Sequence, residues 1–167
     1  MRTFTLLHVA ISLLGIGSGL VVLFGLFEAN RLNRWTALFL TTTVLTSVTG
    51  FFFPADRLLP SHVVGALSLV LLAAAIVARY PRRLAGPWRT VYVIGAVVSL
   101  YFNVFVLIVQ SFRRVPSLRT LAPTQTEPPF VVAQLLALTI FAAATLLAVV
   151  RFRDEAVART GRHAVNV

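Results

Sequence analysis

The chain alternates long apolar runs with short polar connections. Five stretches contain no charged side chain and hold 21 to 25 residues each: Thr3 to Phe27, Trp35 to Ala55, Leu58 to Ala78, Thr90 to Phe112 and Pro128 to Val150. Because a helix rises about 1.5 Å per residue, roughly 20 residues cross a hydrocarbon core about 30 Å thick. The pattern predicts an all-α integral membrane bundle of five transmembrane helices, at about 4–27, 35–53, 60–78, 89–112 and 129–150.

The connections predict how these helices are arranged. The links at 28–34, 54–61 and 79–89 are short, which favours antiparallel neighbours packed in chain order. Only the segment 113–128 is longer, and its three prolines, with Pro129 directly after it, favour turns or extended backbone. We expect one transmembrane domain at 1–150 and a basic tail at 151–167 that forms a short, fraying juxtamembrane helix. The first apolar run is too long for a signal peptide, so it is kept as a span.

The arginines predict the orientation. All 15 basic residues are arginine. Five spans would place five of them on one side (Arg2, Arg57, Arg113, Arg114 and Arg119) and the other ten on the opposite side with the tail. Since positive charge in short loops favours the cytoplasm, we expect the N-terminus outside and the C-terminus in the cytoplasm. Arginine without lysine, together with abundant Ala, Leu and Val, is typical of a bacterial protein and hence of the inner membrane.

Composition excludes several classes of function. Cysteine is absent, so disulfides, thiol catalysis, Cys-ligated zinc and iron–sulfur clusters are excluded. A net charge of +10 would suggest nucleic acid in a soluble protein, but here the arginines adjoin spans, where they meet anionic lipid headgroups. The expected partner is therefore the bilayer and not nucleic acid. Ser, His and carboxylate residues never gather at motif spacing, so no catalytic residue, no metal ligand and no enzyme activity is predicted.

Polar residues inside the spans fall on three helical stripes. A polar side chain in hydrocarbon must find a partner or face a cavity, so these stripes are expected to meet inside the bundle. They comprise Tyr92, Ser99, Asn103 and Gln110 in the fourth span, Thr42, Thr46 and Thr49 in the second, and His8, Ser12, Gly15 and Gly19 in the first. The last two glycines form a GxxxG pair, which allows close helix packing.

Most of these polar residues fall in the predicted outer half of the membrane. The sequence therefore predicts an outward-facing polar pocket lined by His8, Thr46, Thr49, His62, Ser99, Asn103, Gln110, Glu127 and Gln134. Structural alternatives stay open: the histidines could sit at the wet interface, the threonines could bond to the carbonyl one turn earlier, and Asn103 could form an interhelical hydrogen bond.

The quoted segments YFNVFVLIVQSFRRVPSLRTLAPTQTEPPFVVAQ (101–134), TSVTGFFFP (46–54) and LPSHVVG (59–65) resemble small multi-span inner-membrane proteins of bacteria that have no assigned activity. The resemblance covers most of the chain. It implies a multi-span membrane fold and brings no substrate, cofactor or catalytic residue.

Three functions follow as alternatives. The leading hypothesis is a membrane protein whose outward pocket binds or passes a small solute, although the lack of charged residues in the spans argues against a pump. The second is a structural or assembly partner that docks another membrane protein, or a second copy, through small-residue faces such as Ala142, Ala143 and Ala144. The third is a haem b electron-transfer subunit with His8 and His62 as axial ligands; otherwise no cofactor is predicted.

Overall fold

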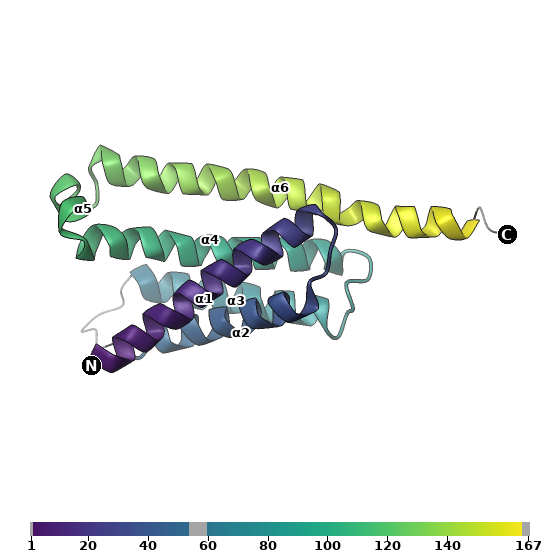
Figure 1. The fold of residues 1–167 in the computed structure, drawn as a ribbon, viewed down its shortest axis with the longest axis horizontal. Coiled ribbons are helices and arrows are strands. Elements are labelled where there is room, and N and C mark those ends of the chain that lie inside the picture. Colours follow the sequence, from purple (N-terminus) through teal and green to yellow (C-terminus); the bar gives the residue numbers. More distant parts are fainter. Residues whose placement is uncertain (1, 54–59, 165–167) are drawn as a thin grey trace.

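The protein folds as a bundle of long helices that run alternately up and down (Figure 1). The computed structural model describes the backbone of residues 2–53 and 60–164, and the side chains of 3–53 and 62–152. Residues 54–59 of the predicted link at 54–61 and the last three residues of the predicted tail lie outside the described residues. Within these ranges every regular element is a helix: α1 (Arg2–Phe27), α2 (Asn33–Gly50), α3 (Pro60–Arg79), α4 (Trp88–Arg114), α5 (Pro116–Leu121) and α6 (Pro128–Ala164).

Helix α4 is the centre of the bundle. It packs against α1, α2, α3, α5 and α6, whereas α1 and α2 pair with each other and α6 lies at the edge. The buried face of α4 carries Tyr92, Val93, Ala96, Val97 and Leu100. Lipid tails are as apolar as these side chains, so close packing, rather than removal from water, is what holds the helices together in a membrane.

Two glycines allow the closest helix contacts. A Cβ atom on Gly19 of α1 would lie 2.6 Å from Cδ1 of Leu100 and 2.8 Å from Cε2 of Phe39. A Cβ atom on Gly95 of α4 would lie 2.8 Å from the backbone oxygen of Leu71 in α3. The first contact confirms the close packing that the glycine pair of the first span predicts.

Four helices are long and apolar enough to cross a membrane, over Thr3–Phe27, His62–Arg79, Trp88–Arg114 and Pro128–Phe152. Helix α2 is not among them. It begins with Asn33 and Arg34 and carries seven hydroxyl side chains in 18 residues. The structure thus confirms an all-helical bundle with several helices that are long and apolar enough to span a membrane, but it does not confirm exactly five spans.

The connection between α4 and α6 contains a helix that the sequence analysis did not predict. Val115 is extended, with φ −84° and ψ 116°, because the ring of the next residue, Pro116, clashes with a helical conformation there. Pro116 is then the first residue of α5, where its missing N–H removes no helical hydrogen bond. The expectation of turns or extended backbone throughout 113–128 is therefore wrong for Pro116–Leu121.

Helix α6 is longer than one membrane crossing. Its 37 residues correspond to about 55 Å of helix. Its C-terminal part projects beyond the bundle, at the end opposite α5 (Figure 1). The predicted boundary at residue 150 is therefore a change of composition and not a break in the backbone, which continues as helix to Ala164.

Candidate functional site

The predicted polar stripes of α1 and α2 meet near the N-terminal end of α1. Nδ1 of His8 lies 2.8 Å from the hydroxyl oxygen of Thr49, and this hydroxyl also donates to the carbonyl oxygen of Leu45 at 2.6 Å. The Ser12 hydroxyl donates to the His8 carbonyl oxygen at 2.7 Å, one turn earlier. The threonine and serine thus use the back-bonding geometry that was the structural alternative for such residues, and His8 links the two helices.

A second polar contact joins α4 to α2. Nδ2 of Asn103 donates to the hydroxyl oxygen of Thr43 at 3.4 Å, and Thr43 is fully buried. A Cβ atom built on Gly15 of α1 would lie 3.4 Å from that hydroxyl and 3.6 Å from Nδ2 of Asn103. Residues of α1 and α2 therefore lie beside this amide of α4. This arrangement fits the alternative in which Asn103 forms an interhelical hydrogen bond.

Other hydroxyl groups in the bundle interior have no hydrogen-bond partner among the described residues. The side-chain oxygens of Thr46 and Ser99 are buried in this way, and so is that of Ser68 in α3. They lie among tightly packed side chains, because Ser99 and Ser68 are almost wholly buried. The polar faces of α1, α2 and α4 thus contact one another through closely packed side chains. We call this contact region, which includes His8, Thr43, Thr49, Ser99 and Asn103, the seam.

The remaining predicted pocket residues lie apart from this seam. Gln134 of α6 donates from Nε2 to the carbonyl oxygen of Phe105 at 3.3 Å, which ties α6 to α4. Gln110 accepts from Nε of Arg114 at 3.3 Å on the exposed side of α4. The structure therefore divides the nine predicted residues among several separate contacts.

The two membrane histidines have different aromatic neighbours. The His8 ring meets Phe53 edge-on, with centroids 5.0 Å apart, and the His62 ring stacks on Phe51 at 5.6 Å. Within the described residues, no group of three or more His, Cys, Asp or Glu side chains could hold a metal ion.

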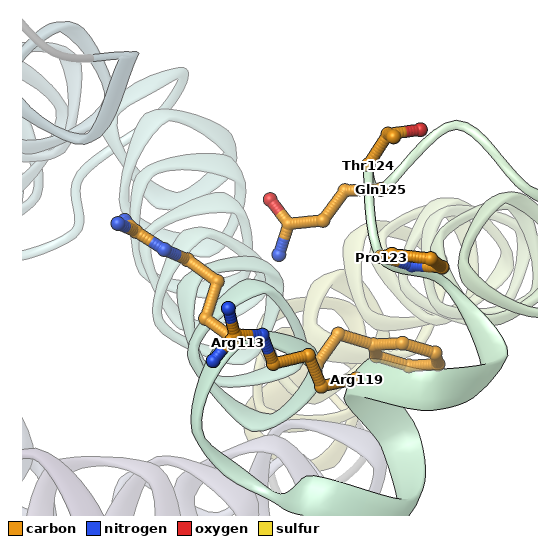
Figure 2. Close-up of a pocket in the computed structure, with 6 residues that line it drawn as sticks. Arg113, Arg119, Pro123, Thr124 and Gln125 are labelled. Carbon is orange, nitrogen blue, oxygen red and sulfur yellow. The ribbon is translucent and has the colours of Figure 1, made fainter.

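A pocket lies in the segment between Gln110 and Glu127 and is lined by none of the nine predicted residues (Figure 2). Its volume is about 300 Å³. It is formed by the end of α4, by α5 and by the loop that follows, and its lining residues are Phe112, Arg113, Arg119, Pro123, Thr124 and Gln125. This pocket is therefore a different one from the outward-facing pocket that the sequence predicts, because the two sets of lining residues do not overlap.

Local backbone geometry builds this pocket. Gln125 adopts a left-handed conformation, with φ 62°, and its Nε2 donates to the carbonyl oxygen of Val109 at 2.9 Å. Figure 2 shows the Gln125 side chain reaching toward α4 while the Thr124 hydroxyl turns away. Beneath the pocket, the buried Phe112 ring meets Phe130 of α6 edge-on at 5.4 Å. These contacts fold the loop back onto α4 and fix the lining side chains to a rigid base.

Glu127 holds the loop instead of lining the pocket. Its carboxylate accepts hydrogen bonds from the backbone N–H and the hydroxyl of Thr124, at 3.1 and 2.9 Å, and from the backbone N–H of Thr126 at 3.1 Å. Desolvation alone would raise the pKa of this carboxyl, but the hydrogen bonds outweigh it and hold the pKa below its ordinary value. The carboxylate of Glu127, the only acidic residue of 110–127, thus accepts its hydrogen bonds from residues of its own loop.

The pocket is electropositive as a result. Arg113 and Arg119 both line it, and among the described residues neither has a carboxylate partner. The third arginine of the segment, Arg114, bonds to Gln110 and does not line the pocket. Two guanidinium groups without acidic partners can bind an anion, and this is the chemistry that the site offers.

A second arginine cluster lies at the opposite end of the bundle and was also missed. Arg79, the last residue of α3, is only 8% exposed, and its NH2 donates to the Arg31 carbonyl oxygen at 2.8 Å and to Oδ1 of Asn33 at 2.7 Å. It also stacks over Tyr92, whose hydroxyl lies 3.4 Å from that of Thr36. In the sequence, Arg79 counted only as one of the ten arginines on the predicted cytoplasmic side. Its position at a helix C-terminus, where a cation is favoured, is the only signal that could have set it apart.

Comparison with known proteins adds no family. No protein-family model matches the chain, no curated protein matches it significantly, and no solved structure does so either.

Proposed function

We propose that this protein is an integral membrane protein that binds a small anionic solute in the pocket between α4, α5 and the following loop. The observation that carries the proposal is the pairing of Arg113 and Arg119 in one pocket that has no acidic lining residue. The proposal keeps the predicted function, the binding of a small solute. It assigns this function to the loop segment after α4 instead of to the polar residues of the packed seam.

We further propose that α2 is the fifth span. Its hydropathy is low because of Asn, Arg and hydroxyl residues, yet Thr36, Thr42, Thr43 and Ser47 are buried against other helices. A hydroxyl that faces the protein is not exposed to lipid, so it does not oppose membrane insertion of the assembled bundle. Helix α2 lies alongside α1 and α3, which supports a full crossing (Figure 1).

Five spans and the ten-to-five split of arginines support an N-terminus outside and a C-terminus in the cytoplasm of a bacterial inner membrane. The pocket then faces outward, away from the arginine-rich side that would meet anionic lipid headgroups. This orientation makes an external solute the natural ligand.

The proposal is tested by calorimetric titration of the detergent-solubilised chain with chloride, acetate, malonate and inorganic phosphate at constant ionic strength. We expect at least one of these anions to bind, and Arg113→Ala/Arg119→Ala to abolish that binding. Arg114→Ala is the matched control, because this arginine is next in the chain but bonds to Gln110 outside the pocket. If none of the four anions binds the unmodified chain, the proposal is wrong.

The second candidate function is that of an assembly partner. Only 17% of the apolar stretch of α6 is buried inside the protein, and Ala142 and Ala143 lie on its exposed face. This face could receive a helix of another membrane protein or of a second copy. A stable complex in mild detergent, lost on Ala143→Leu, would support this function, and a monomer at all concentrations would oppose it.

A further inference from the structure

We propose that the anion bound in the α4–α5 pocket carries a phosphate group, presented either by a lipid headgroup or by a soluble phosphate ester. This inference rests on the proposed function, because it identifies the ligand class of the same pocket. The argument uses the charge, the donor geometry and the surroundings of the pocket.

The charge of the pocket suits a dianion better than a monoanion. Arg113 and Arg119 each bring one positive charge, and the Glu127 carboxylate, which is directed to Thr124 and Thr126, does not line the pocket and forms no ion pair with either arginine among the described residues. A phosphate monoester carries close to two negative charges at neutral pH. A single carboxylate or a halide would leave one arginine uncompensated.

The donors also suit a tetrahedral oxyanion. One guanidinium fork is enough to satisfy the two oxygens of a carboxylate, whereas this pocket offers two forks from two different helices. Figure 2 shows that the two arginine side chains come from different elements and extend in different directions. Two forks together carry enough donors for three or four oxygens, and a volume of about 300 Å³ exceeds what a bare halide would fill.

The surroundings of the pocket suit a phosphate that carries an apolar group. Val115, which precedes α5, and Leu121, its last residue, are 41% and 56% exposed. The pocket lies at the end of a membrane-spanning helix, where headgroup phosphates occur, and its floor is the Phe112 ring. A lipid could therefore place its phosphate between the arginines and its chains along the apolar residues, and the hydrocarbon part of a soluble ester could do the same.

The test compares ligands and variants of the full chain. Calorimetric titration in detergent would use inorganic phosphate, with malonate as a dianion that lacks the tetrahedral group, and acetate and chloride as monoanions. For the lipid source, native mass spectrometry would measure retention of phosphatidic acid against diacylglycerol, which has the same chains without the phosphate. The variants are Arg113→Ala/Arg119→Ala, Arg113→Lys/Arg119→Lys, and the control Arg114→Ala.

We expect phosphate to bind at least about tenfold more tightly than malonate, acetate or chloride, because two charge-assisted forks each contribute to its affinity. The alanine pair should abolish this preference, the lysine pair should weaken phosphate binding while keeping the charge, and Arg114→Ala should behave like the unmodified chain. Phosphatidic acid retained by the unmodified chain and lost from the alanine pair would identify a lipid source; phosphate binding without such retention would identify a soluble ester.

Malonate binding as tightly as phosphate would overturn the phosphate inference and leave the anion-binding proposal standing. Phosphate binding that survives in the alanine pair would overturn the inference by placing the anion elsewhere. Because Arg113 and Arg119 are exposed, the variants should unfold at the same temperature as the unmodified chain in ligand-free buffer, which separates lost binding from lost fold.

Discussion

The guanidinium of Arg79 lies over the ring of Tyr92, 5.1 Å from its centroid, and at the same time donates to the backbone of Arg31 in the connection between α1 and α2. One side chain of α3 thus fastens the α1–α2 connection to α4. Its positive charge is buried without an acidic partner among the described residues. Two neutral acceptors and an aromatic face replace part of the water that it has lost, while its other terminal nitrogen is buried with no hydrogen-bond partner in the described part of the chain.

Replacement of Arg79 by alanine should destabilise the fold by about 2–3 kcal/mol, since charge-assisted hydrogen bonds contribute roughly 1.5–3 kcal/mol each and the Arg31 carbonyl would lose a donor. Lysine should restore little of this, because it cannot stack and donate in the same geometry. The measurement is unfolding in mixed micelles of rising SDS content. Arg82, which lies over the ring of Trp88 on the surface, is the control; Arg82→Ala should change stability by less than about 1 kcal/mol.

The contact between Asn103 and Thr43 should stabilise the bundle only slightly. Interhelical hydrogen bonds in membranes average about 0.6 kcal/mol, and this one is long at 3.4 Å. We therefore expect a double-mutant cycle with Asn103→Leu and Thr43→Val to give a coupling of at most about 0.6 kcal/mol. A cysteine at position 103 should also resist a membrane-impermeant thiol reagent that modifies Arg113→Cys. Rapid labelling at 103 would instead show that a solvated pocket reaches into the seam.

Gly95 should tolerate no larger residue. A Cβ atom there would lie 2.8 Å from the Leu71 backbone oxygen and 3.1 Å from Cβ of Ala75, so α3 and α4 would have to separate. Gly95→Ala should destabilise the protein by about 1–3 kcal/mol. Gly17, which has nothing within 4 Å of the same added atom, is the matched control: Gly17→Ala should be neutral or stabilising because alanine favours the helix. Equal effects at the two positions would contradict the close packing of α3 on α4.

The loop that builds the pocket should loosen in acid. The folded state lowers the Glu127 pKa, so the carboxylate stabilises the loop above the ordinary value of 4.5, and this contribution is lost as the pH falls through the lower folded-state value. Limited proteolysis within 122–127 by an acid-active protease should accelerate over this interval. The Glu127→Gln variant should already be cleaved faster at a pH above 4.5, and its cleavage should not accelerate further in acid beyond the protease's own pH dependence. If the variant shows the same acceleration as the unmodified chain, another titrating group is responsible.

The number of spans should be readable from the two ends of the chain. Five crossings place the termini on opposite sides, whereas four place them on the same side. We expect a green fluorescent protein fused after Val167 to fluoresce, an alkaline phosphatase inserted in 116–125 to be active, and a cysteine in place of Thr3 to be labelled from outside by a membrane-impermeant reagent, as five spans and the arginine split predict. Activity of a phosphatase fused at Val167 would reverse the orientation. Both termini on one side would remove α2 from the membrane.

Much of the fold could be predicted from apolar runs, because a run of that length forms a helix wherever it lies. The predicted span at 89–112 differs from α4 by no more than two residues at either end. The prediction was incomplete where a helix continues beyond the end of an apolar run. The charges after Val150 end the apolar run, but they do not end α6, since charged side chains are compatible with a helix that has left the membrane.

The site was harder to predict because it depends on contacts between residues that are distant in the sequence. Asn103 was singled out as a pocket residue or an interhelical tether, and its contact Thr43 lies one helical step from the predicted threonine stripe. Arg113 and Arg119 were treated as orientation charges. They share a pocket only because Pro116 restarts a helix and Gln125 folds back to Val109, sixteen residues earlier.

The length of α6 has a mechanical consequence. Its first turn packs beside the pocket through Phe130 and Phe112, and its last turn lies clear of the bundle at the other end. A continuous helix of 37 residues is stiff and has no hinge along its length. Any tilt of α6 about its contacts with α4 and α1 would therefore also displace its projecting end. A change in the position of the apolar part of α6 would thus be accompanied by a displacement at the opposite end of the helix.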